Sequence, residues 1–105
     1  ALESANRAIQ ANSNLAQGWQ NRAVALVALK QYPEVQKSYE QAIVLDQTNA
    51  EAWTGLGLVL AQQKQYPKAL QALQTAVSLN PKQAVAQQAL KALMEMQQQL
   101  NTPKL

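Results

Sequence analysis

The chain of 105 residues has no cysteine, no histidine and no phenylalanine. Without cysteine there is neither a disulfide framework nor a thiolate nucleophile, and the redox compartment stays open. Without histidine, the commonest general base and the commonest metal ligand are both absent. We therefore expect no metal site and no catalysis that depends on either side chain.

Acidic residues are few and dispersed. They fall in different predicted helices or turns, and no two are spaced to share an acid-base site: Glu3, Glu34, Glu40, Asp46, Glu51 and Glu95. The three glycines form no phosphate-binding loop. The sequence thus predicts no catalytic residue, no cofactor and no enzyme.

Positive charge is dispersed as well. The nine lysines and arginines occur singly, although the formal net charge is +3. Nucleic-acid binding depends on clustered cations that displace counterions, and this pattern is more typical of a solvated surface. No apolar run approaches the length of a transmembrane helix. We expect neither a nucleic-acid partner nor a membrane segment, and nothing here fixes the compartment.

What the sequence does contain is a period of 34 residues. Trp19 is repeated at Trp53, and the tetrapeptide Lys-Gln-Tyr-Pro at 30–33 is repeated at 64–67. Alanine, leucine and glutamine dominate, so the intrinsic preference is helical nearly throughout. A period of this length indicates stacked supersecondary units, each of which buries its apolar face only against its neighbours.

The repeat predicts one domain over residues 1–105. It would comprise the second helix of a truncated repeat (1–14), two full repeats (16–49 and 50–83), a C-terminal capping helix (84–101) and a tail (102–105). Asn49 is a predicted helix cap, and the last helix is expected from Lys82 to about Leu100. Because residue 1 falls in the middle of a repeat, we expect the chain to be a piece of a longer array.

The pattern resembles the tetratricopeptide repeat (TPR) family, whose unit is an antiparallel helix pair with a Trp, Leu-Gly, Tyr, Ala, aromatic, Ala, Pro signature. The second repeat matches it with Trp53, Leu56, Gly57, Ala69, Ala76 and Pro81. The first repeat matches it with Trp19, Ala23, Tyr39 and Ala42. The resemblance implies an all-α fold, a right-handed α-solenoid of antiparallel helix pairs with about five helices.

Three departures from the family pattern are informative. Arg22 stands where the family prefers leucine. Its side chain either makes a polar contact or lies with its methylene groups along Trp19 and its guanidinium in solvent. We expect the second. Gln87 replaces tryptophan and Lys91 replaces glycine in the last helix, which is the composition expected of a cap. Its inner stripe is predicted to include Met94.

In this family the first helices of successive repeats line a concave groove that holds an extended or helical peptide. The resemblance implies groove positions that do not lie on the packing face of Trp19 and Trp53. These positions are Gln17, Gln20, Val24, Val27, Ala28, Glu51, Thr54, Leu58, Ala61, Gln62, Val85, Gln88 and Ala92. The alternative is that they are merely exposed helix positions and that the binding repeats lie elsewhere.

One subgroup of the family clamps a C-terminal carboxylate with cationic and amide side chains. The matching positions here carry no positive charge: Gln20, Val24, Gly55, Val85 and Ala89. We therefore expect a groove ligand to be recognised by amide hydrogen bonds and by apolar contact with Val24, Val27 and Leu58, not by charge.

The resemblance implies a non-catalytic scaffold that binds a peptide or partner protein, whose identity the sequence does not give. A rival hypothesis is self-association through exposed repeat ends, since a chain that begins within a repeat leaves a packing face open. A third is helical-repeat RNA binding, against which the period, the signature and the lack of groove cations argue.

Overall fold

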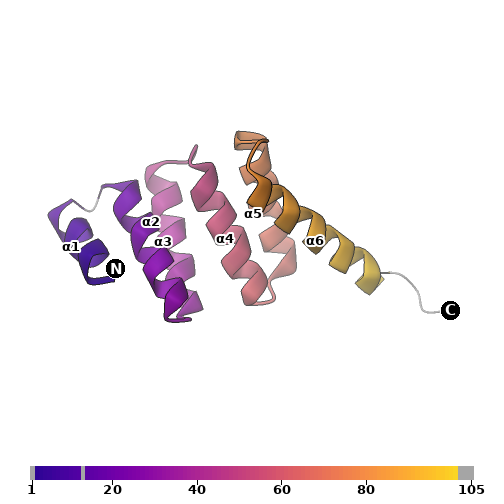
Figure 1. Cartoon of the computed structure of the whole chain (residues 1–105), viewed down its shortest axis with the longest axis horizontal. Helices are drawn as coiled ribbons and strands as arrows, with labels where there is room; N and C mark the ends of the chain where they lie inside the picture. Colours follow the sequence, from indigo (N-terminus) through magenta and orange to yellow (C-terminus); the bar gives the residue numbers. More distant parts are fainter. Residues whose placement is uncertain (1, 13, 102–105) are drawn as a thin grey trace.

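The computed structural model describes residues 2–12 and 14–101, and within them every regular element is an α-helix (Figure 1). The described residues form six helices: α1 (Leu2–Ala11), α2 (Ala16–Ala28), α3 (Tyr32–Leu45), α4 (Ala50–Gln62), α5 (Tyr66–Leu79) and α6 (Ala84–Asn101). The expected number of about five was one too few, because a half unit, two pairs and a final helix make six. The predicted tail, 102–105, lies outside the described residues.

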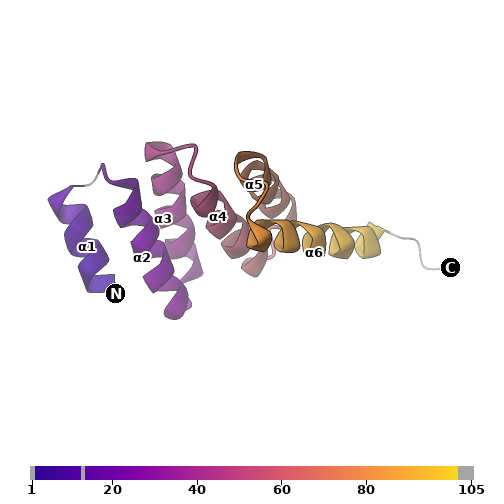
Figure 2. The same cartoon turned by 45° about the horizontal axis from the view of Figure 1, so that its top comes forward.

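The helices pack in chain order. α2 packs on α3 and α4 on α5 as antiparallel pairs, and α3 then contacts α4 while α5 contacts α6. The result is an elongated solenoid of helix pairs measuring 58 × 27 × 19 Å, with α1 at one end and α6 extending past the other helices (Figures 1 and 2). Each pair buries its apolar side against the next one along the chain.

Both turns within the helix pairs have the same left-handed geometry. Lys30 has φ 58° and donates its amide to the Val27 carbonyl at 2.9 Å, while the Gln31 amide bonds to the Leu26 carbonyl at 3.2 Å. This is a Schellman motif, which satisfies carbonyls that the helix end leaves free. Lys64, with φ 62°, repeats the motif in the second pair. Glycine adopts this conformation at less cost, and a non-glycine residue there stores about 1 kcal/mol of strain.

Two sequence expectations about the helices are confirmed. The Asn49 side chain accepts a bond from the Ala52 amide at 3.3 Å, so it caps α4. A Cβ atom on Gly57 would lie 2.6 Å from Leu73 Cγ, so the missing side chain lets α5 approach α4 closely. Both tryptophans, Trp19 and Trp53, are half-buried and pack against the core.

Two expectations about the last helix were wrong. It begins at Ala84 and not at Lys82, because the Asn80 side chain accepts the Lys82 amide at 3.2 Å and forms a turn around Pro81. Met94, assigned to the inner stripe, is 52% exposed, because α6 has no neighbouring helix on that side.

The expectation for Arg22 was also wrong, because its head does not point into solvent. Its side chain is only 23% exposed, and Nη1 donates to the Ser38 hydroxyl at 2.6 Å while Nε donates to Asn6 at 3.0 Å. Nη2 lies 3.8 Å from the Glu34 carboxylate. The guanidinium therefore ties α1, α2 and α3 together where the second pair has an apolar leucine.

Candidate functional site

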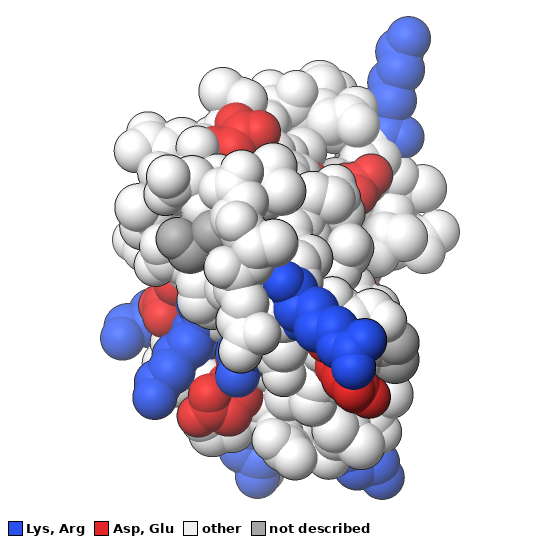
Figure 3. Space-filling view, turned by 90° about the vertical axis from the view of Figure 1, so that its left-hand side faces the viewer, with Lys and Arg blue, Asp and Glu red and all other residues white. Residues whose placement is uncertain are grey.

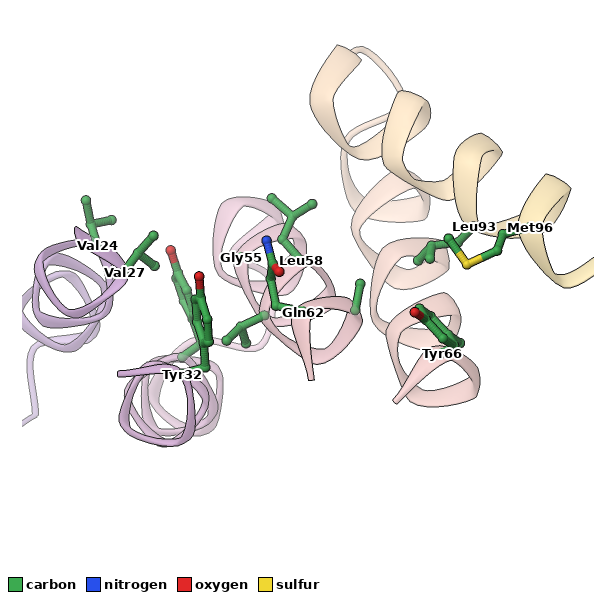
Figure 4. Close-up of a pocket in the computed structure, with 12 residues that line it drawn as sticks. Val24, Val27, Tyr32, Gly55, Leu58, Gln62, Tyr66, Leu93 and Met96 are labelled. Atoms are coloured by element: carbon green, nitrogen blue, oxygen red, sulfur yellow. The ribbon is translucent and has the colours of Figure 1, made fainter. Parts of the chain in front are cut away.

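An open cavity of about 620 Å³ lies on the side formed by α2, α4 and α6. We call it the central cavity. Its lining comprises Val24, Val27, Tyr32, Tyr39, Gly55, Leu58, Val59, Ala61, Gln62, Tyr66, Leu93 and Met96. Figure 4 shows Val27 of α2 beside Tyr32, while Leu93 and Met96 of α6 point back toward α4 and Tyr66. Three successive first helices and the starts of two second helices thus supply the walls.

The floor of the cavity depends on a contact between Tyr39 of α3 and Gly55 of α4. A Cβ atom on Gly55 would lie 2.2 Å from Tyr39 Cζ, so the ring occupies the space that any other side chain would need. Tyr39 is itself buried. Burial, and secondarily the Glu51 carboxylate, raise the pKa of the Tyr39 phenol above its usual value.

The structure brings part of the predicted groove together. Val24, Val27, Leu58 and Gln62 all line the central cavity, together with Ala61. The other predicted positions lie outside the lining: Gln17, Gln20, Ala28, Glu51, Thr54, Val85, Gln88 and Ala92. The cavity therefore occupies the half of the groove nearest the C-terminal ends of α2 and α4. Contact of any of these residues with a ligand stays a prediction.

Two of the predicted groove residues are buried, with Gln20 7% and Thr54 4% exposed. Gln20 accepts a bond from Asn49 at 2.7 Å and donates to Glu51 at 3.0 Å. One repeat later, the Thr54 hydroxyl donates to Gln83 at 2.9 Å. Both side chains therefore link a first helix to the start of the next repeat, which fixes the spacing of the helices that carry the cavity.

Sequence reasoning missed several lining residues. The tyrosines at the starts of α3 and α5, Tyr32 and Tyr66, recur at the 34-residue period, and that recurrence is a signal that could have found them. The family correspondence marks Gly55 as a clamp position, but its contact with Tyr39 gives no signal in the sequence, because another helix supplies that ring. Met96 of α6 also lines the cavity, where a methionine can serve as an adaptable contact.

The cavity lining contains no charged side chain. At the α1 end of the molecule, basic and acidic groups lie side by side (Figure 3). Within the residues that the structure describes, no three acidic side chains gather as a metal site. Across 2–12 and 14–101, no helix combines the length and the apolar character of a membrane span.

The family comparisons agree with the geometry. A tetratricopeptide repeat model matches residues 50–83, and a second TPR repeat model matches residues 23–64. The chain belongs to the tetratricopeptide repeat family. No curated protein matches it.

Solved TPR structures share the fold. The Arabidopsis OM64 TPR domain is 25% identical, with a TM-score of 0.87 over 90% of this chain and 78% of that one. The second TPR domain of human RPAP3, solved with the HSP70 peptide SGPTIEEVD, is 28% identical, with a TM-score of 0.83 over 89% and 78%. The Sgt2 TPR domain from Aspergillus fumigatus is 20% identical, with a TM-score of 0.92 over 99% and 72%, and shows the fold alone.

Proposed function

We propose that this chain is a non-catalytic protein-interaction scaffold that binds an apolar segment of a partner protein in the central cavity. The observation that carries the proposal is the cavity itself: about 620 Å³ lined by aliphatic and phenolic side chains without a charged group. Burial of apolar surface contributes roughly 25 cal/mol per Å². Stacked helices hold the walls in place, so little ordering entropy is lost when a partner docks.

The same lining argues for a ligand unlike that of the human RPAP3 domain. The peptide in that complex, SGPTIEEVD, ends in two glutamates, a valine and an aspartate. In this chain the positions that would hold a terminal carboxylate include Val24 and Gly55, which line the cavity and carry no charge. An extended peptide that buries its acidic end in this lining would lose the hydration of its carboxylates without gaining cationic partners there.

The proposal can be tested with a synthetic peptide that carries leucines at helical i, i+4 and i+7 spacing and only glutamine and serine elsewhere. We expect the wild-type chain to bind this neutral peptide by isothermal titration calorimetry, and to bind SGPTIEEVD at least about tenfold more weakly. Leu58→Asp places a carboxylate in the apolar wall and should weaken binding of the neutral peptide by about tenfold or more.

Val44→Asp is the matched control. Val44 is 68% exposed and outside the cavity lining, whereas Leu58 is 41% exposed and within it. Both changes put an aspartate on an exposed helix position, so the control reports on general effects of the substitution. Equal loss of binding in the two variants, or no binding of the neutral peptide by the wild-type chain, would overturn the proposal.

A further inference from the structure

The composition of the central cavity bears on the backbone conformation of what binds there. An extended peptide brings unpaired N–H and C=O groups, which need partners when they leave water. Gln62 supplies the one amide side chain in the lining, and the other polar groups there are three phenols. A helix bonds its own backbone groups internally and presents only side chains to the wall. The lining therefore favours a helical ligand.

Two lysines lie in the turns whose neighbours in the chain line the cavity. Lys30 lies in the chain between Val27 and Tyr32, and Lys64 lies between Gln62 and Tyr66, so cavity residues flank each lysine on both sides. Both lysines are exposed. The ion pairs of the described chain are Arg7–Glu3, Arg22–Glu34 and Lys37–Glu34, so neither turn lysine is neutralised by a carboxylate.

Both lysines also occupy a backbone conformation that suits glycine better. Lys30 and Lys64 have φ 58° and 62° in matching Schellman turns. A cation near a helix C-terminus interacts favourably with the helix dipole, which is one reason to place lysine there. The helix dipole does not neutralise the lysine ammonium groups, which stay exposed to water in both repeats. The two turns together form a positive edge, which we call the lysine edge.

The opposite end of the same helices differs in charge. Glu51 lies in the first turn of α4, where Gln20 donates to its carboxylate at 3.0 Å. Toward the start of α4, a ligand in the central cavity thus meets the Glu51 carboxylate, which is hydrogen-bonded to Gln20. Toward the two turns, it meets the ammonium groups of Lys30 and Lys64, which form no ion pair with a described carboxylate. The chain also has a net charge of +3, which favours encounter with an acidic partner.

We infer that the central cavity binds an amphipathic helix of a partner protein whose apolar face enters the cavity and whose acidic edge faces Lys30 and Lys64. This inference rests on the proposed function and adds the conformation and charge of the ligand. It also revises the expectation that charge plays no part: apolar contacts supply most of the affinity, and the lysine edge selects among apolar helices.

The experiment compares two versions of the neutral leucine peptide, one with glutamates along a single edge and one with lysines in the same places. We expect the wild-type chain to bind the glutamate peptide about tenfold more tightly than the lysine peptide at low salt, because two exposed charge pairs change sign. High salt should narrow the difference by screening and leave binding of the neutral peptide nearly unchanged.

The double variant Lys30→Glu/Lys64→Glu should reverse the preference. Lys82→Glu/Lys91→Glu makes the same change in net charge at exposed positions outside the two turns, and should keep the wild-type preference. Lys30→Gly/Lys64→Gly suits the left-handed backbone and removes the charge, so it should bind both peptides equally while remaining folded. Circular dichroism of the bound peptides should show helix.

The outcomes separate the two proposals. No binding of the neutral peptide overturns the proposed function, whereas equal binding of the glutamate and lysine peptides by the wild-type chain overturns only the inference. A bound peptide without helical signal also overturns the inference. So does a dimer of this chain in light scattering that the peptide dissociates, because a second copy would then be the natural occupant of the cavity.

Discussion

The two helix pairs share one backbone plan but fill their interiors with different side chains. The first helices have 13 residues each and the second helices 14 each, and both pairs close with the same left-handed turn. Within that plan, Arg22 of the first pair corresponds to Leu56 of the second, and Tyr39 corresponds to Leu73. The comparison teaches that turns and small residues set the frame, while the interior accepts polar groups that have hydrogen-bond partners.

A second difference is how side-chain volume is divided between two facing positions of neighbouring repeats. The position of Tyr39 on a second helix faces the position of Gly55 on the next first helix. At the 34-residue period, the same two positions read Ala5 with Asn21, Tyr39 with Gly55, and Leu73 with Ala89. A larger side chain on one side goes with a smaller one on the other, as close packing of the interior requires.

The largest expected effect comes from breaking the tyrosine and glycine pair. Gly55→Ala puts a Cβ atom 2.2 Å from Tyr39 Cζ, and overpacking of this kind costs about 1–3 kcal/mol. Urea denaturation should therefore show a lower free energy of unfolding, although alanine favours helix. The double variant Tyr39→Leu/Gly55→Ala reproduces the combination of the next repeat and should recover most of the loss.

Gly18→Ala is the control for helix propensity. Its Cβ atom would lie 3.4 Å from Ile9 Cγ1, an ordinary contact, so this variant should be more stable by about 0.5–1 kcal/mol. If Gly55→Ala were as stabilising as Gly18→Ala, the ring of Tyr39 would not occupy the space assigned to it.

A smaller effect is expected from making the first pair resemble the second at Arg22. Arg22→Leu removes the donor to the buried Ser38 hydroxyl, and an unsatisfied buried group costs about 1–3 kcal/mol. The added apolar contact offsets part of this cost, so we expect a net loss of about 1 kcal/mol in thermal or urea unfolding.

The partner variant is Arg22→Leu/Ser38→Ala, which removes both polar groups. Replacing a buried polar network by apolar groups of similar size is often neutral or stabilising, and the double variant should be at least as stable as the wild-type chain. A double variant as unstable as Arg22→Leu alone would contradict this, and would show that the lost bonds from Arg22 to Asn6 and Glu34 outweigh the unsatisfied Ser38 hydroxyl.

The smallest expected effect is a pH dependence of stability that comes from Tyr39 and has no counterpart at the equivalent residue Leu73. Because the folded-state pKa of Tyr39 is raised, the folded chain holds this proton when the unfolded chain has lost it. The free energy of unfolding should therefore fall as pH rises from the usual tyrosine pKa of 10.0 toward the higher folded value. Leu73, in the equivalent position, makes no such contribution.

The measurement compares denaturation of the wild-type chain and Tyr39→Leu across alkaline pH. Subtracting the two curves leaves the contribution of Tyr39, because every other titratable group is present in both chains. Phenolate absorbance of the wild-type chain should also show an ionisation above the usual tyrosine pKa that is missing from Tyr39→Leu. Identical high-pH ionisation in the two chains would contradict the assigned burial.

The local elements could be predicted because they depend on neighbouring residues. The helical spacing, the two Tyr-Pro helix starts and the cap at Asn49 are all encoded within a few residues of where they act. The small residue at Gly57 was predictable too, because the family pattern marks it. The contact of Gly55 with Tyr39 was not, because these residues belong to different repeats and the pairing has no fixed signature.

The sequence alone determined the helices, their pairing in chain order and the family, because a repeat of 34 residues leaves each apolar face only its neighbours to pack against. Only the tertiary structure decided which side chains meet across repeats. It turned Arg22 inward onto Ser38, buried Gln20 and Thr54 between helices, and made an uncharged cavity from residues of successive repeats. These results depend on distances between helices, which the order of residues in one helix does not specify.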